Sequence, residues 1–246
     1  MIINSRYIKY FIFFTFIFSF SSIGDIYANS ENTKSNSKVA YKIDFSDYSK
    51  GSIDEWLLSK GFVLAKDAND REMLDLDIGS NRLRLNIKNK SFGLIINEKV
   101  DVINYDKIRI EWGVNKFPGK AAYSKGVYNE ALMLYIFFGK EKMESGSMLI
   151  PNSPYFIGFY LCDNDQVNVP YFGKYFKVGG RYVCVNKPEK EKVVVTELNL
   201  KEWFIKLYKG NVSPIITGIS LGFDTRFAEE NGIASAFIKK IEFLKN

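Results

Sequence analysis

Residues 107–114 read KIRIEWGV, a segment in which apolar and polar side chains alternate. Ile108, Ile110, Trp112 and Val114 fall on one side of an extended chain, and the residues between them fall on the other. This two-residue period is typical of a β-strand with one buried and one solvated face. The segment therefore predicts a half-buried strand whose sheet packs against a core.

The same alternation recurs along most of the chain. We predict further strands over residues 41–45, 74–78, 82–88, 92–97, 131–138, 155–162, 181–186, 192–197, 215–223 and 234–244. β-Branched and aromatic residues are frequent in these segments, and Gly, Pro, Asn or Asp separates them. The pattern predicts an all-β protein, with one antiparallel β-sandwich domain over residues 39–246.

Two short segments follow a helical period instead. Residues 52–59 place three apolar side chains on one side and are followed by Gly61. In NLKEWFIKLYKG, residues 199–210, apolar side chains recur at i, i+3, i+4, i+7 and i+8, Asn199 can cap the start, and Gly210 can end the helix. We expect one or two short helices, the second plugging one end of the sandwich with its aromatic stripe in the core.

The N-terminal residues predict export. Two basic residues precede an apolar run over residues 10–20, and small residues follow up to Ala28. This is the pattern of a signal peptide, and the run is too short for a permanent transmembrane helix. We expect a signal peptide over 1–28, a disordered polar lead-in over 29–38, and no membrane span after cleavage. The pattern leaves periplasmic and secreted locations open.

Cys162 and Cys184 are the only cysteines of the chain. Because exported proteins fold in oxidising compartments, we predict that the two thiols form a disulfide. The chain-entropy model gives such a loop a stabilisation of roughly 3 kcal/mol. A thiol nucleophile would need a base beside it, and the chain contains no histidine.

The absence of histidine excludes Ser-His-Asp triads and histidine-containing zinc sites. A metal would need oxygen ligands, which makes calcium the only ion considered. Its candidates are Asp163 and Asp165 and the acidic loop over residues 67–70. Asp and Asn are also ordinary turn residues, so we interpret both acidic segments as turns and predict no cofactor.

The formal net charge is +6, and the basic residues are scattered along the predicted strands. Solvated strand faces explain such a distribution better than nucleic-acid binding, so we predict no nucleic-acid partner. Weak attraction to an anionic cell surface stays open, as does the oligomeric state.

A loop between two predicted strands carries an aromatic motif, YFGKYF. Its rings are Tyr171, Phe172, Tyr175 and Phe176. Exposed rings of this kind can form a sugar platform, a membrane-interface patch or a protein contact. The alternative is that the loop folds back and packs on the edge of the sandwich. We take these residues as the candidate ligand-binding site.

The order of segments resembles a bacterial exported family catalogued as domain of unknown function 3047, over about residues 91–243. The similar segments include SFGLIINEKV, KIRIEWGV, LMLYIFFG, EWFIKLYKG and ISLGFDTRF. Two positions depart from the family pattern, since Asn129 replaces one acidic residue before Glu130 and Arg226 replaces another after Asp224. The resemblance implies a jelly-roll-like sandwich similar to carbohydrate-binding modules, and it implies no settled activity.

Three functions are compatible with these observations. We prefer a binding module that holds a glycan or other cell-envelope ligand. The first alternative is a carboxylate-dependent, glycan-active enzyme, which needs only a pair of Asp or Glu side chains; its candidates are Glu111, Glu130 and Asp224. The second alternative is a structural or interaction protein of the envelope. Because no acidic pair has a diagnostic spacing, we do not expect an enzyme.

Overall fold

The structure is a computed structural model that describes residues 37–246 except 211–212 and 230. The predicted signal peptide and most of the predicted lead-in lie outside the described residues. The first strand begins at Lys38, next to the expected domain start at Val39.

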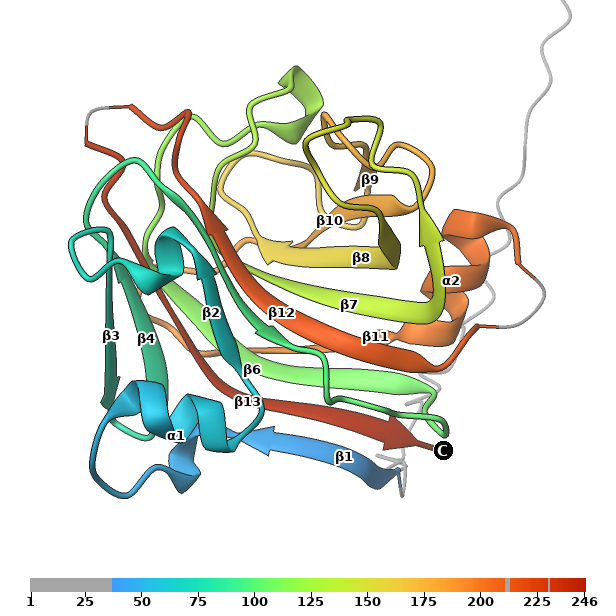
Figure 1. Cartoon of the computed structure of the whole chain (residues 1–246), viewed down its shortest axis with the longest axis horizontal. Helices are drawn as coiled ribbons and strands as arrows, with labels where there is room; N and C mark the ends of the chain where they lie inside the picture. The colour runs from blue at the N-terminus through green and yellow to red at the C-terminus, as the bar shows by residue number, and fades with distance from the viewer. Residues whose placement is uncertain (1–36, 211–212, 230) are drawn as a thin grey trace, which may run out of the picture. The chain divides into compact units, whose positions relative to one another are not determined.

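The described residues form a β-sandwich of two sheets (Figure 1). The first sheet runs in the order β11 (Val194–Asn199), β6 (Lys107–Lys116), β13 (Ala234–Lys245), β4 (Arg82–Ile87) and β3 (Leu74–Gly79), and β1 (Lys38–Asp44) pairs with the end of β13. The second sheet runs in the order β2 (Val63–Lys66), β5 (Phe92–Asn97), β12 (Ile216–Asp224), β7 (Glu130–Met143), β8 (Ser153–Leu161), β10 (Gly180–Asn186) and β9 (Pro170–Tyr171). The predicted antiparallel sandwich is confirmed, with one departure: β8 and β10 run parallel.

The segment KIRIEWGV lies in β6, and its predicted buried face is confirmed. Ile108, Ile110, Trp112 and Val114 have no exposed surface and belong to the core between the sheets. The Trp112 indole N–H donates to Thr196 Oγ1 at 2.9 Å, so its one polar group is satisfied in the core. Three of the alternate residues of β6, Lys107, Arg109 and Glu111, form ion pairs with β11 or β13.

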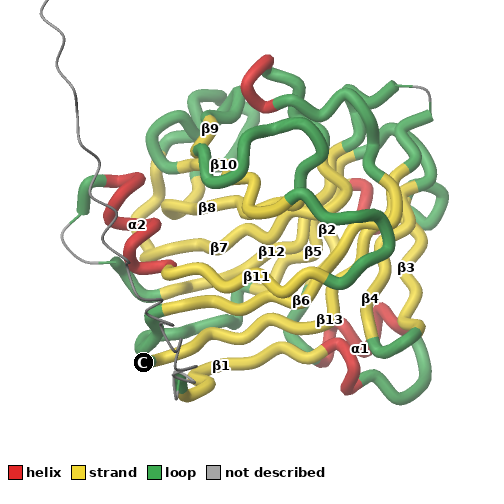
Figure 2. The backbone as a smooth tube through the Cα atoms, turned by 180° about the vertical axis from the view of Figure 1, so that it is seen from behind, coloured by secondary structure: helices red, strands yellow, loops and turns green. Residues whose placement is uncertain are grey.

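Both predicted helices form, as α1 (Ile53–Ser59) and α2 (Leu200–Tyr208). Asn199 caps α2 by accepting the Glu202 N–H at 3.1 Å, as predicted. Phe204 packs on Phe138 with ring centroids 4.9 Å apart, and Figure 2 shows α2 at one end of the strands. Short 3-10 helices lie at Phe45–Asp47 (η1), Asp67–Asn69 (η2) and Tyr123–Lys125 (η3). Among the described residues, neither α-helix is both long and apolar enough to cross a lipid bilayer.

Candidate functional site

The outer face of the second sheet carries a second apolar cluster, separate from the core between the sheets. It arises because β7 is apolar on both faces: Leu134 and Ile136 point into the core, while Met133, Tyr135 and Phe137 point outward. The other members come from β5, β8, β9, β10 and nearby loops, and they are Leu94, Tyr123, Tyr128, Phe156, Tyr160, Cys162, Tyr171, Phe176, Tyr182 and Cys184. We call this set the tyrosine cluster.

Two glycines let the Tyr135 ring lie close against the sheet. Gly158 is the register partner of Tyr135 on β8, and Gly222 lies on β12 at the other side of the ring. A Cβ atom at Gly222 would stand 2.6 Å from Tyr135 Cε2, and one at Gly158 would stand 3.3 Å from Tyr135 Cε1. Any larger residue at Gly222 would therefore push the ring away from the sheet.

A carboxyl group lies at the edge of this cluster. Glu130 is the first residue of β7, and only 4% of its surface is exposed. The Tyr123 hydroxyl donates to Glu130 Oε2 at 2.7 Å. Asp224 is the register partner of Glu130 on β12, and it is also buried. Two buried carboxyl groups from distant parts of the chain are thereby neighbours on adjacent strands.

Arg226 distinguishes the two carboxyl groups. Its Nε donates to Asp224 Oδ1 at 3.0 Å and its Nη2 to Asp224 Oδ2 at 2.5 Å, in a bidentate ion pair. The hydrogen bond to Asp224 raises the pKa of the Arg226 guanidinium. The guanidinium also lies 4.7 Å from the centre of the Phe92 ring. Arg226 thus neutralises Asp224, and in the described part of the chain it donates no hydrogen bond to Glu130.

Burial raises the pKa of Glu130 well above its usual range, and the charge of Asp224 raises it further. The hydrogen bond from Tyr123 and the charge of Arg226 oppose this shift without cancelling it. Burial and the nearby Glu130 likewise raise the pKa of the Tyr123 and Tyr135 hydroxyls. These phenols therefore stay protonated, and Glu130 is suited to hold a proton and donate it.

The loop with η3 is attached to the sheet by Asp165. One carboxylate oxygen of Asp165 accepts the Tyr123 N–H at 3.1 Å and the Tyr160 hydroxyl at 2.9 Å. The Tyr123 ring then packs on Tyr160 and Tyr182, with centroids 4.8 and 5.3 Å apart. Asp165 thus positions Tyr123, whose hydroxyl donates to Glu130.

The acidic loops considered for calcium have other roles. Asp163 is exposed, while Asp165 is buried in the contacts just described. Asp67 accepts the Phe92 N–H at 2.9 Å, and Asp70 accepts the Glu72 N–H at 2.8 Å. Within residues 37–246, apart from the undescribed positions, no three Asp, Glu or Cys side chains are grouped as a metal site would require.

The predicted aromatic site is divided by the structure. Tyr171 and Phe176 turn inward to the tyrosine cluster, where Phe176 packs edge-on against Phe156 at 5.4 Å. Phe172 is 54% exposed, and the Arg181 guanidinium covers its ring at 4.1 Å. Tyr175 is half-buried, with Lys174 Nζ at 5.3 Å from its ring. The four rings therefore do not share one platform.

The three predicted carboxylates are also divided. Glu130 and Asp224 lie together on the second sheet, whereas Glu111 lies on β6 of the first sheet. Lys239 and Lys240 bind the Glu111 carboxylate at 3.2 and 3.0 Å. Burial raises the pKa of Glu111, but these lysine contacts outweigh it and lower the pKa overall. Glu111 is therefore an outward ion-paired group, separate from the tyrosine cluster.

The predicted disulfide is confirmed. Cys162 and Cys184 are joined, with their Cα atoms 5.6 Å apart, and both are buried. The bond links the end of β8 to its parallel neighbour β10. It closes the segment that carries Asp165, Tyr171 and Phe176, so it ties the loops of the tyrosine cluster to the sheet.

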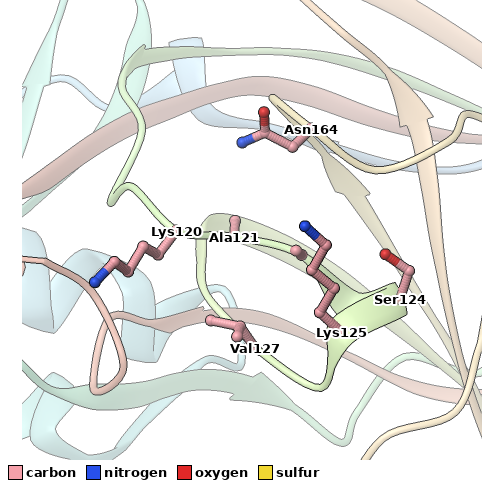
Figure 3. Close-up of a pocket in the computed structure, with 7 residues that line it drawn as sticks. Lys120, Ala121, Ser124, Lys125, Val127 and Asn164 are labelled. Atoms are coloured by element: carbon pink, nitrogen blue, oxygen red, sulfur yellow. The ribbon is translucent and has the colours of Figure 1, made fainter.

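A hollow of about 360 Å³ is lined by residues in and around η3 and by Asn164 (Figure 3). Lys120, Ser124, Lys125 and Asn164 line it together with the apolar side chains of Ala121, Ala122 and Val127. Lys120 pairs with Glu229 at 2.8 Å. Tyr123, which lies between these lining residues in the chain, contacts the tyrosine cluster instead.

Sequence reasoning missed Tyr123, Tyr135, Tyr182 and Arg226 as site residues. One signal was present in ALMLYIFF, residues 131–138, where every position is apolar. A strand that is apolar on both faces must be covered on both faces. The outward residues of β7 could therefore have been predicted to lie under other loops, although which loops cover them could not.

The fold and site define a β-sandwich protein with a tyrosine-lined buried carboxyl group on the outer face of one sheet. No family model matches the chain, and no curated protein matches its sequence. A solved family 29 carbohydrate-binding module in complex with mannohexaose has 8% identity and a TM-score of 0.36, over 85% of this chain and 94% of that one. A cellulohexaose complex of such a module has 8% identity and a TM-score of 0.36, over 85% and 93%. The Endo-D glycoside hydrolase domain from Streptococcus pneumoniae R6 has 9% identity and a TM-score of 0.36, over 75% of this chain and 21% of that one.

Proposed function

We propose that the protein binds a glycan on the outer face of the second sheet, around Glu130. One observation carries the proposal: Glu130 is buried among tyrosine rings outside the core between the sheets. Burying a carboxyl group costs free energy unless its environment compensates. Stability alone does not require a carboxyl group at this position, and recognition of a polar ligand would account for it.

The surroundings of Glu130 offer both an apolar surface and polar groups, which are the two features that a sugar ring presents. Phe137 and Tyr182 are only partly buried, and they provide aromatic faces on which the apolar C–H face of a pyranose can pack. Glu130 and Arg226 provide a carboxyl group and a charged donor for sugar hydroxyls. Ligand sites in proteins commonly combine an apolar lining with a few convergent polar groups of this kind.

We further propose that this binding takes place outside the cytoplasm. The disulfide supports an oxidising compartment, because such bonds are rare in reducing ones. The export signal over residues 1–28, the likeness to the exported family and the choice between periplasm and medium stay predictions.

The proposal is tested by calorimetric titration of the protein with soluble mannan, xylan, glucan and peptidoglycan fragments. At least one is expected to bind, and Glu130→Gln is expected to weaken its binding about tenfold or more, as for a lost hydrogen bond to a charged or acidic group. Glu111→Gln is the matched control, since it removes a carboxylate from the other sheet. If no fragment binds, or if both variants bind equally well, the proposal is wrong.

The geometry also favours one second candidate, hydrolysis of a glycosidic bond by Glu130 and Asp224. The two carboxyl groups are neighbours with opposite environments, one with a raised pKa and one paired with Arg226. Such a pair suits a general acid and an ionised partner. Reducing-sugar release from the bound glycan, abolished in both Glu130→Gln and Asp224→Asn, would support this function. Glycan binding without release of reducing sugar would contradict the hydrolase function and support the binding function only.

A further inference from the structure

The hairpin between β7 and β8 ends in two fully exposed apolar side chains. Met148 is 104% exposed and Leu149 is 93% exposed. They are the most exposed large apolar residues of the described chain. Adjacent apolar side chains that project this far commonly mark a contact surface. We call residues 148–149 the hairpin tip.

The hairpin tip is held by a hydrogen-bonded turn. Ser145 is buried, and its Oγ lies 2.7 Å from the Ile150 carbonyl oxygen and 2.9 Å from that of Ser147. The Ser145 N–H donates to Asn152 Oδ1 at 3.2 Å, which closes the base of the turn. The turn thus stabilises a conformation in which both apolar side chains face solvent.

A second loop lies beside the hairpin and adds apolar surface. The Phe176 N–H donates to the Ser145 carbonyl at 2.8 Å, which joins the two loops. Val178 in the second loop is 61% exposed. Phe172 is linked to the same loop through Arg181, which stacks on its ring and bonds the Val178 carbonyl. Figure 1 shows the hairpin next to β9, where this loop begins.

The flanks of this surface are mainly basic. Lys140, Lys142, Lys174 and Lys177 are all exposed. Among the described residues, none of these four lysines forms an ion pair. Glu141 and Glu144 are also exposed nearby, so positive charge predominates. An apolar tip surrounded by lysines is complementary to an anionic lipid surface.

We propose that the hairpin tip docks the protein onto an anionic lipid bilayer. Met148 and Leu149 enter the interfacial region, and the lysines contact the lipid headgroups. Both side chains are fully exposed on a turn, which suits entry into a deformable bilayer better than insertion into a shaped protein pocket. This role is independent of the glycan site, because the tip contributes no residue to the tyrosine cluster.

Co-sedimentation with lipid vesicles tests the proposal, with protein obtained by expressing the full chain. We expect the protein to bind vesicles rich in phosphatidylglycerol and to bind vesicles of phosphatidylcholine alone only weakly. Binding to the anionic vesicles should decrease as the salt concentration rises. Met148→Ser with Leu149→Ser should lower binding about tenfold or more. Lys142→Gln with Lys177→Gln should lower binding to the anionic vesicles about tenfold.

Leu58→Ser with Ile103→Ser is the matched control, because these side chains are 61% and 66% exposed elsewhere on the protein. All variants keep the same N-terminal residues, so any contribution from the predicted signal peptide is constant. Equal binding of the tip variant and the control variant would overturn the proposal. Equal binding to neutral and anionic vesicles, or binding to neither, would also overturn it, and a protein contact would then explain the exposed tip.

Discussion

Glu130 on β7 and Asp224 on β12 are register partners in adjacent antiparallel strands, but of these two carboxyl groups only Asp224 forms an ion pair with an arginine of the described chain. The two carboxyl groups therefore share a location and differ in environment. Asp224 is compensated by a bidentate ion pair with Arg226, whereas Glu130 has a tyrosine hydroxyl. This asymmetry makes Glu130 the proton-holding member of the pair.

Glu130 should make the stability of the protein depend on pH. Because its folded-state pKa is raised, the folded chain keeps a proton that the unfolded chain loses above its pKa of roughly 4.3. The contribution of Glu130 is fully present below that pH and is lost as the pH rises through the folded-state value. In this window the wild type should lose up to about 1.4 kcal/mol per pH unit relative to Glu130→Gln, measured by urea unfolding.

Glu111→Gln is the control with the opposite sign. The lysine contacts lower the pKa of Glu111, so its contribution is present above the unfolded pKa and is lost as the pH falls through the folded-state value. Because the Glu111 carboxylate is partly solvated, its effect on stability should be smaller than that of Glu130. A constant difference between wild type and Glu130→Gln across the pH range would contradict the assignment of a raised pKa.

Tyr123→Phe should destabilise the protein by about 1–2 kcal/mol, since it removes the hydroxyl that donates to a buried carboxyl group. It should also raise the pKa of Glu130 further, because that hydrogen bond opposes the shift. Unfolding in urea at two pH values measures both effects. Tyr128→Phe is the control: it lies in the same cluster, and within the described residues its hydroxyl has no hydrogen-bond partner. Equal losses in the two variants would contradict the role of the Tyr123 hydroxyl.

Gly222→Ala should displace the Tyr135 ring and destabilise the protein by about 1–3 kcal/mol. The added Cβ would stand 2.6 Å from the ring, too close for any real contact. Gly218→Ala on the same strand is the control, because its nearest neighbour would be the Asn97 carbonyl oxygen at 3.3 Å. Gly222→Ala should lower the unfolding temperature and the glycan affinity more than Gly218→Ala does, as measured by thermal unfolding and glycan titration. The Tyr135 argument fails if Gly218→Ala is the more damaging change.

Removing the disulfide should cost roughly 3 kcal/mol of stability, from the chain entropy of the closed loop. Cys162→Ala with Cys184→Ala should also weaken glycan binding, because the closed segment carries Asp165, which positions Tyr123. Urea unfolding with and without a reductant measures the first effect. The reductant should destabilise the wild type and leave the double variant unchanged; an effect on both would point to a cause other than this bond.

Local periodicity was sufficient to predict both helices and the longer strands. KIRIEWGV and the helix with Phe204 were predicted correctly because side-chain direction repeats every two residues in a strand and about every 3.6 in a helix. The two short strands Val63–Lys66 and Pro170–Tyr171 were missed, since so few residues cannot display a period. The parallel pairing of β8 with β10 was missed for a different reason, because strand partners lie far apart in the chain.

By itself, the amino-acid sequence determined which residues face a core, which two cysteines could pair, and which chemistry the absence of histidine excludes. These properties depend on composition and on the nearest few residues. Tertiary structure alone decided that Glu130 meets Asp224, that Glu111 does not, and that Tyr123 rather than Tyr175 contacts the carboxyl group. Strand register and loop packing bring those side chains together, and both depend on contacts between distant segments of the chain.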